Sequence, residues 1–154
     1  MSDGKTHKKI AMASGGVAAF LATDEKEPWK LVAETLGGVL GGLVGGKLPD
    51  IIEPAVHSWH RNVAHSVTVG TAVIGAAAKS VQSWHASCRA KADAWAQRRL
   101  DTNLTPADRA FALLAELAWR IAAGIPIGAA AGYISHLVLD AGTPRGIPLI
   151  ARGF

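Results

Sequence analysis

The segment from Trp29 to Gly46 most constrains the fold, because its glycines recur at every fourth residue. They form two interleaved rows, Gly37, Gly41, Gly45 and Gly38, Gly42, Gly46. Residues four apart share one face of a helix. Each glycine costs an isolated helix about 1 kcal/mol relative to alanine, so packing must compensate. We therefore expect a Gly-rich central helix in very close contact with its neighbours, in a bundle or in a membrane.

The rest of the chain favours an all-α fold, a compact bundle of about five helices. We expect helices over 8–22, 29–46, 64–83, 83–100 and 105–140. Thr105 and Pro106 form a good start signal, a capping residue followed by proline at the first helical position. Gly124 and Pro126 should disturb the last helix, and Pro49 should end the second, with loop from 51 to 59. The β-branched residues between 67 and 74 are equally compatible with a strand.

Length and composition bound the class of protein. The 154 residues fit one domain, 1–154, in which 83–104 is a possible insertion. A hydrophobic content of 49% lies at the apolar edge of soluble proteins. The lone Cys88 cannot form an internal disulfide, which suits a reducing compartment. Basic residues before an apolar run over 10–22 imitate a signal peptide, but no clear cleavage site follows, so we expect this segment to be retained.

The net charge of +4 is modest, and its placement is more informative. Basic residues gather in two places: Lys5, Lys8, Lys9, and Arg89, Lys91, Arg98, Arg99. With Trp84 and Trp95 on one stripe, the segment 83–100 is predicted to bind an anionic membrane surface or a protein groove. A solvated helix face is the simpler alternative. No nucleic-acid-binding motif is present, and the glycine rows would also suit a homo-oligomer.

Four polar stretches interrupt the apolar background. They are Thr6-His7, Pro49-Asp50 with Glu53-Pro54, His60-Arg61 with His65-Ser66, and the stretch from Ser135 to Asp140. In the last, His136 and Asp140 are four residues apart, so a helix places both on one face, within reach of one cation. An ordinary hydrogen-bonded pair has the same spacing. Because buried imidazoles and carboxylates need partners, we expect the four stretches to converge on one site.

Taken in order, these stretches resemble the YdjM family of membrane-associated, metal-dependent hydrolases, which is grouped with zinc-dependent phospholipases C and single-strand nucleases. The matching motifs are Thr6-His7, Leu48-Pro49-Asp50, the stretch His60 to Ser66, and the stretch Gly132 to Leu149. The family usually has His-Arg-Gly, where this chain has Asn62. A second His-x-x-x-Glu pair, which the phospholipases carry, is absent from the sequence. The resemblance implies one or two metal ions and favours a helix over 67–74.

The resemblance and the residue types together predict a metal site. Its candidate ligands are His7, Asp50, His65, His136 and Asp140. Nitrogen and carboxylate ligands suit zinc, and also manganese or iron. The candidate catalytic residues are Glu53, His60 and Arg61. Glu53 could accept a proton from water, and Arg61, next to His60, suits an anionic phosphate or a structural salt bridge. His57 and His85 have no partner pattern, so we expect them at the surface or behind the ligands.

Function and location follow as expectations. We expect a metal-dependent hydrolase of lipid or nucleotide phosphoesters. The alternative is a non-enzymatic structural or interaction protein, in which the His/Asp cluster is a structural metal site or a hydrogen-bond site. The run from Ile121 to Leu139 has 19 residues without Asp, Glu, Lys or Arg, the lower limit for a membrane span. Because that run contains Pro126 and His136, we favour a cytoplasmic bundle or a peripheral protein at the cytoplasmic face of the inner membrane, with an integral membrane protein as the alternative.

Overall fold

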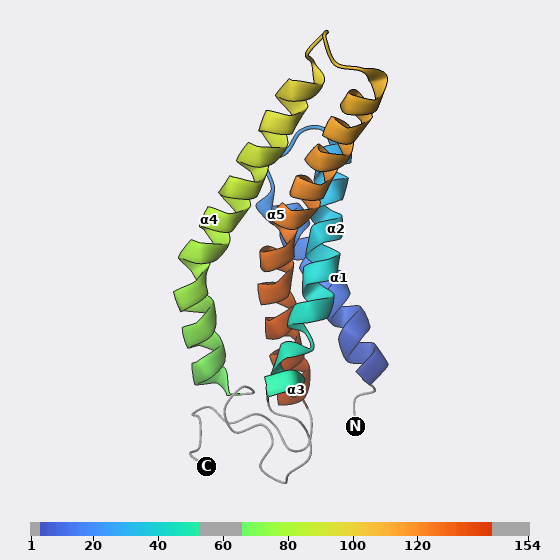
Figure 1. The fold of residues 1–154 in the computed structure, drawn as a ribbon. Helices are drawn as coiled ribbons and strands as arrows, with labels where there is room; N and C mark the ends of the chain where they lie inside the picture. The colour runs from blue at the N-terminus through green and yellow to red at the C-terminus, as the bar shows by residue number, and fades with distance from the viewer. Residues whose placement is uncertain (1–3, 53–65, 143–154) are drawn as a thin grey trace.

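The computed structural model describes residues 4–52 and 66–142, and these form helices and short connections without a strand. The helices are α1 (Gly4–Ala22), α2 (Pro28–Gly45), α3 (Leu48–Ile52), α4 (Val67–Arg99) and α5 (Pro106–Ala141). Helix α5 contacts all three other long helices, and α1 and α2 also contact each other (Figure 1). The all-α prediction is confirmed. The predicted central position of the Gly-rich helix is not, because α5, and not α2, packs closely against all three of the other long helices.

The observed helices differ from the predicted five in three places. The segments 64–83 and 83–100 were expected as two helices, but residues 67–99 form one helix, α4. No glycine or proline occurs from 76 through 99, so nothing in the backbone interrupts it. Pro49 lies inside α3, and residues 51 and 52, predicted as loop, complete that short helix. Helix α5 continues through Gly124 and Pro126 without a break.

Capping residues explain where the two longest helices begin. The Ser66 side chain accepts a hydrogen bond from the Val69 amide at the start of α4. The Thr105 hydroxyl caps α5 by accepting from the Asp108 amide, and the Asp108 carboxylate accepts from the Thr105 amide, so a complete capping box is present. These bonds satisfy amides that have no partner within the helix. The start predicted from Thr105 and Pro106 is therefore confirmed.

One glycine row of α2 faces α5 at backbone distance. A Cβ atom at Gly37, Gly41 or Gly45 would lie 1.9 Å from a carbonyl oxygen of α5. The other row faces α1, since a Cβ at Gly42 would lie 2.2 Å from the Ala11 oxygen. Both glycine rows therefore make close helix contacts within this chain, as their spacing predicts. The predicted homo-oligomer stays a prediction.

Helix α5 contributes a third glycine row that the sequence analysis missed. A Cβ at Gly124, Gly128 or Gly132 would lie 2.0 to 2.3 Å from a backbone oxygen of α2. The same four-residue spacing was visible in the sequence and could have identified this row. The two helix backbones therefore approach each other through reciprocal glycines. This contact also explains why α5 keeps glycine at Gly124, where a helix break was predicted.

The uninterrupted course of α5 past Pro126 depends on a side chain of α4. Proline has no amide hydrogen, so the carbonyl of Ala122, four residues earlier, loses its helical donor. The Trp84 indole N–H donates to that oxygen at 2.9 Å.

Trp95 of α4 also contacts α5. Its ring packs edge-on against Phe111, with ring centroids 5.6 Å apart. The predicted membrane or protein partner of 83–100 stays a prediction.

We expect Trp84→Phe to destabilise the protein by about 1–3 kcal/mol, because the Ala122 carbonyl would lose the donor that replaces its helical one. Pro126→Ala restores a backbone donor to the same oxygen. The Trp84→Phe substitution should therefore cost much less in the Pro126→Ala background. A double-mutant cycle on thermal unfolding measures this coupling. Equal costs in both backgrounds would show that the indole hydrogen bond does not replace the missing helical one.

Candidate metal centre

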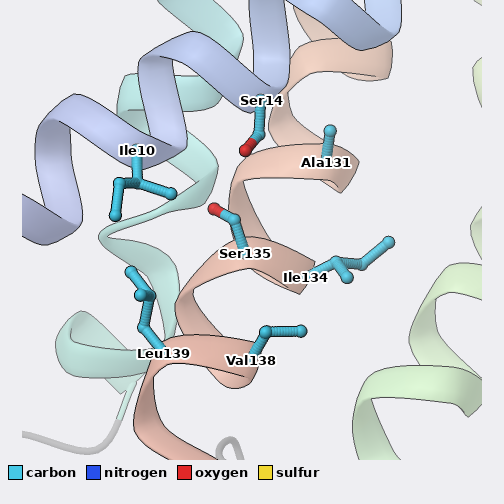
Figure 2. Close-up of a pocket in the computed structure, with 7 residues that line it drawn as sticks. All are labelled: Ile10, Ser14, Ala131, Ile134, Ser135, Val138 and Leu139. Carbon is cyan, nitrogen blue, oxygen red and sulfur yellow. The ribbon is translucent and has the colours of Figure 1, made fainter. Parts of the chain in front are cut away.

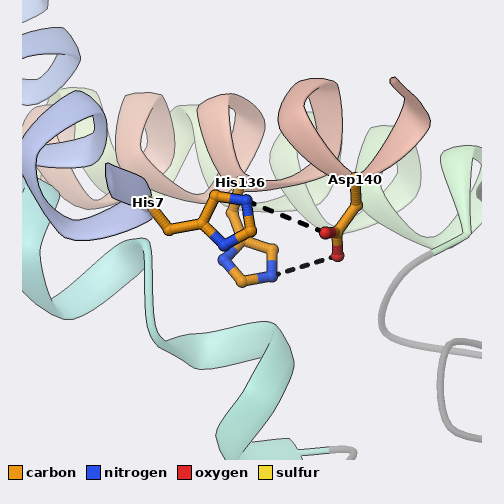
Figure 3. A group of neighbouring side chains, drawn as sticks. All are labelled: His7, His136 and Asp140. Carbon is orange, nitrogen blue, oxygen red and sulfur yellow. Dashed lines mark ion pairs between the residues drawn. The ribbon is translucent and has the colours of Figure 1, made fainter. Parts of the chain in front are cut away.

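Three helix ends bring the candidate ligands together at one end of the bundle. His7 lies in the first turns of α1, Asp50 lies in α3, and His136 and Asp140 lie in the last turns of α5. Figure 3 shows the His7 and His136 rings beside the Asp140 carboxylate. The two ring centroids are 4.8 Å apart. The helical spacing of His136 and Asp140 therefore produces the shared face that the sequence predicted.

The orientation of His136 is set by a backbone carbonyl. Its Nδ1 lies 2.7 Å from the Gly46 oxygen, and because a carbonyl can only accept, Nδ1 carries a proton. The other nitrogen, Nε2, lies 3.3 Å from Asp140 Oδ2 and 3.5 Å from Asp50 Oδ1. A lone pair facing two carboxylates would be repelled, so this geometry favours a proton or a metal cation at Nε2. Fixing Nδ1 by a backbone acceptor is also how proteins orient metal-binding histidines.

His7 completes a group that could hold a metal ion. One ligand atom from each of His7, His136 and Asp140 lies within 4.8 Å of the others. His7 Nε2 is 3.9 Å from Asp140 Oδ1. The Asp140 and His136 side chains are 1% exposed, whereas Asp50 is 58% exposed, so Asp50 forms the solvent side. Imidazole nitrogen and carboxylate oxygen suit zinc, manganese or iron.

The structure therefore brings together three of the five predicted ligands, with Asp50 beside them. The remaining predicted site residues, His65, Glu53, His60 and Arg61, lie outside the described residues, and their roles stay predictions. His57 is also outside. His85 is described, and it has a defined partner that the sequence analysis did not find.

A second polar group, the ionic cluster, lies where α2, α4 and α5 meet. It consists of Glu25, Glu34, His85, Arg89, Asp93 and Arg120. Glu34 is the hub: its carboxylate is 3.2 Å from His85 Nε2, 3.5 Å from Arg89 Nε and 3.4 Å from Arg120 Nη1. Glu34 and Arg120 are each 1% exposed. Charges buried this deeply need partners, and here each has several.

Further charges extend the ionic cluster toward solvent. Arg120 also pairs with Glu25 and Asp93. The hydrogen bond from Arg89 lowers the pKa of Asp24, which lies in the turn between α1 and α2. One signal for the ionic cluster was present in the sequence, the acidic Glu34 within an apolar segment. It did not indicate that His85 is the partner of Glu34, because the two residues are 51 positions apart.

The distribution of side chains is the reverse of a soluble protein's. The largest fully buried side chains are charged or polar, Arg120, His136, Glu34, Glu116 and Asp140. Large apolar side chains are exposed instead: Val32, Leu36, Leu40 and Val44 form one outward row on α2 and are each at least 50% exposed. Small residues at helix contacts and polar residues turned inward are typical of helices in lipid. Fold and site together define a helical membrane protein with a histidine–aspartate cluster at one end.

Two segments, Pro28–Ile52 and Pro106–Ala141, are long and apolar enough to cross a membrane by length and composition. The model of the YdjM inner membrane protein family matches residues 1–151, so the chain belongs to this family. No curated protein and no solved structure matches the chain significantly. The expected membrane association is thereby shown.

Proposed function

We propose that this inner-membrane protein is a metal-dependent hydrolase whose cation is held by His7, His136 and Asp140. The observation that carries the proposal is the convergence of these ligand atoms within 4.8 Å, with Asp50 on the solvent side. The ligands come from both ends of the sequence and meet among apolar helices. A cation compensates the cost of placing this many polar groups in one buried position.

Hydrolysis is the chemistry that this ligand set suits. A zinc or similar cation held by these residues would polarise a phosphoryl oxygen and would lower the pKa of a bound water toward about 7. The Gly46 carbonyl would keep the His136 ring in position, and the exposed Asp50 carboxylate would accept a proton on the solvent side. Glu53 remains the other predicted proton acceptor, and Arg61 the predicted phosphate-binding residue. The choice of a phosphoester as substrate rests on the resemblance to the zinc-dependent phospholipases C and single-strand nucleases.

A structural role for the same metal is the second candidate. Its support is that the cluster joins the start of α1, α3 and the end of α5, so a cation would also hold these helix ends together (Figures 1 and 3). Structural zinc sites are closed by four protein ligands, whereas catalytic sites keep a position for water. The two candidates therefore differ in reactivity and not in metal content.

Metal analysis tests the proposal most directly. We expect protein purified in detergent without chelator to contain about one divalent ion per chain, and His136→Ala or Asp140→Ala to remove most of it, as loss of one ligand weakens binding strongly. His85→Ala is the matched control, because His85 belongs to the ionic cluster and should leave the metal content unchanged. Metal retained near the wild-type level in both ligand variants would rule out the shared site.

The same preparations separate catalysis from structure. Wild-type protein with metal should hydrolyse bis(p-nitrophenyl) phosphate, a water-soluble phosphodiester, and the ligand variants should not. Bound metal without hydrolysis, together with a lower unfolding temperature after chelation, would favour the structural role instead.

A further inference from the structure

An apolar groove lies between α1 and α5 on the outer side of the bundle (Figure 2). One wall is formed by Ile10 and Ser14 of α1, and the other by Ala131, Ser135 and Leu139 of α5. Each set repeats every fourth residue, so the groove follows the helix axes. Its volume is about 390 Å³. This space is large enough for part of a small ligand.

The lining makes the groove suitable for an apolar group. None of its residues is charged, and its hydroxyls belong to Ser14 and Ser135. The Ser135 hydroxyl donates to the Gly132 carbonyl at 2.8 Å, so its proton is already used within α5. A nucleotide base, which has several hydrogen-bonding groups, would lose its water partners there without replacement. A hydrocarbon chain makes no hydrogen bonds to water and therefore loses none in the groove.

The residues that line the groove are close in sequence to the candidate ligands on both helices. Ile10 lies one helical turn after His7, and Leu139 lies between His136 and Asp140 in the sequence. From Leu139 the groove runs along α5 to Ala131, about 12 Å at the helical rise of 1.5 Å per residue. A molecule with its polar part at the ligands could therefore extend its apolar part along the groove, parallel to the bundle.

The outer rim of the groove is also apolar and open. Ile134 and Val138 line it and are 43% and 65% exposed. In a member of an inner membrane protein family, an exposed apolar rim on a bundle of this kind faces lipid. A lipid molecule can then enter sideways, without leaving the bilayer. The end of the bundle would place its head group at the level of the metal ligands.

From these observations we infer that the groove binds an acyl chain of a phospholipid whose phosphoester lies at the His7–His136–Asp140 centre. The inference rests on the proposed hydrolase function and narrows its substrate to a membrane phosphoester. It assigns the positions that recognise the substrate: Ile10, Ser14 and Ala131 would contact the chain and take no part in the chemistry.

The test compares two substrates in metal-loaded, detergent-purified protein. Ala131→Phe fills the groove, and Ala118→Phe is the matched control at an exposed position of the same helix. We expect Ala131→Phe to reduce hydrolysis of dioleoyl phosphatidylglycerol by roughly tenfold or more. Hydrolysis of bis(p-nitrophenyl) phosphate and the metal content should remain within about twofold of wild type, since those depend on the ligands. Ala118→Phe should change neither rate.

Crosslinking tests the groove independently of catalysis. A phosphatidylglycerol with a diazirine in its acyl chain should label peptides that contain Ile10, Ser14 or Ala131 in wild-type protein, and Ala131→Phe should remove this labelling. Labelling without hydrolysis of either substrate would overturn the hydrolase function and keep the lipid site. Equal losses on both substrates, or labelling that Ala131→Phe leaves unchanged, would overturn the groove.

Discussion

Gly41→Ala is expected to destabilise the protein by about 3 kcal/mol or more, whereas Gly75→Ala should leave it unchanged or stabilise it. The first substitution would place a Cβ 1.9 Å from the Ile125 carbonyl oxygen, which belongs to the backbone and cannot rotate away. The second adds the same methyl group on α4, where nothing lies within 4 Å. There the higher helix propensity of alanine contributes up to about 1 kcal/mol.

Thermal unfolding in detergent distinguishes the two substitutions, because they are chemically identical and differ only in their surroundings. We expect a large fall in the midpoint for Gly41→Ala and none for Gly75→Ala. Equal midpoints for both variants would mean that α2 and α5 are not in backbone contact at Gly41. The same comparison at Gly128 examines the contact from the α5 side, where a Cβ would lie 2.0 Å from the Gly38 oxygen.

Arg120→Met is expected to cost about 3–5 kcal/mol, because it removes one partner from a buried ion pair and leaves the other charged. Arg120 is 1% exposed and joins Glu34 to Glu25 and Asp93. Methionine is similar in volume to arginine. The loss of stability would therefore come from the missing charge and hydrogen bonds more than from a cavity.

The control for this prediction is the double variant with Glu34→Gln. Without the buried carboxylate, the loss of Arg120 should cost clearly less than the sum of the two single substitutions. Chemical or thermal unfolding of the four proteins in the cycle provides the comparison. Additive effects would show that Arg120 and Glu34 act separately, against the 3.4 Å contact between them. An unchanged Arg120→Met variant would show that the arginine is not buried in the folded protein.

Features of the site and fold that repeat over one or two helical turns could be predicted. The spacing of His136 and Asp140 placed both ligands on one helix face, and the structure has them there. Gly37, Gly41 and Gly45 indicated a helix face without side chains, and this face does meet another backbone. Both predictions use only the helical repeat, which a single sequence contains.

Contacts between distant segments could not be predicted in the same way. His85 was expected at the surface or behind the metal ligands, but it lies 3.2 Å from Glu34, in the separate ionic cluster. Helix α5 was expected to be disturbed at Pro126, but Trp84 of another helix supplies the missing hydrogen bond. Each outcome depends on which helices are neighbours and on how far each is shifted along its axis relative to the other. Helical periodicity specifies neither.

Local spacing and backbone chemistry are enough to predict a helical chain, close helix contacts at glycine rows, and a histidine and an aspartate together on the last helix. The packed structure adds that α5 is the helix that packs against all the other long ones, and that His7 meets His136 from the opposite end of the sequence. It also shows that the largest buried side chains are charged or polar. The reason is that burial and ion pairing are properties of packed helix pairs, which form only when distant segments of the chain meet.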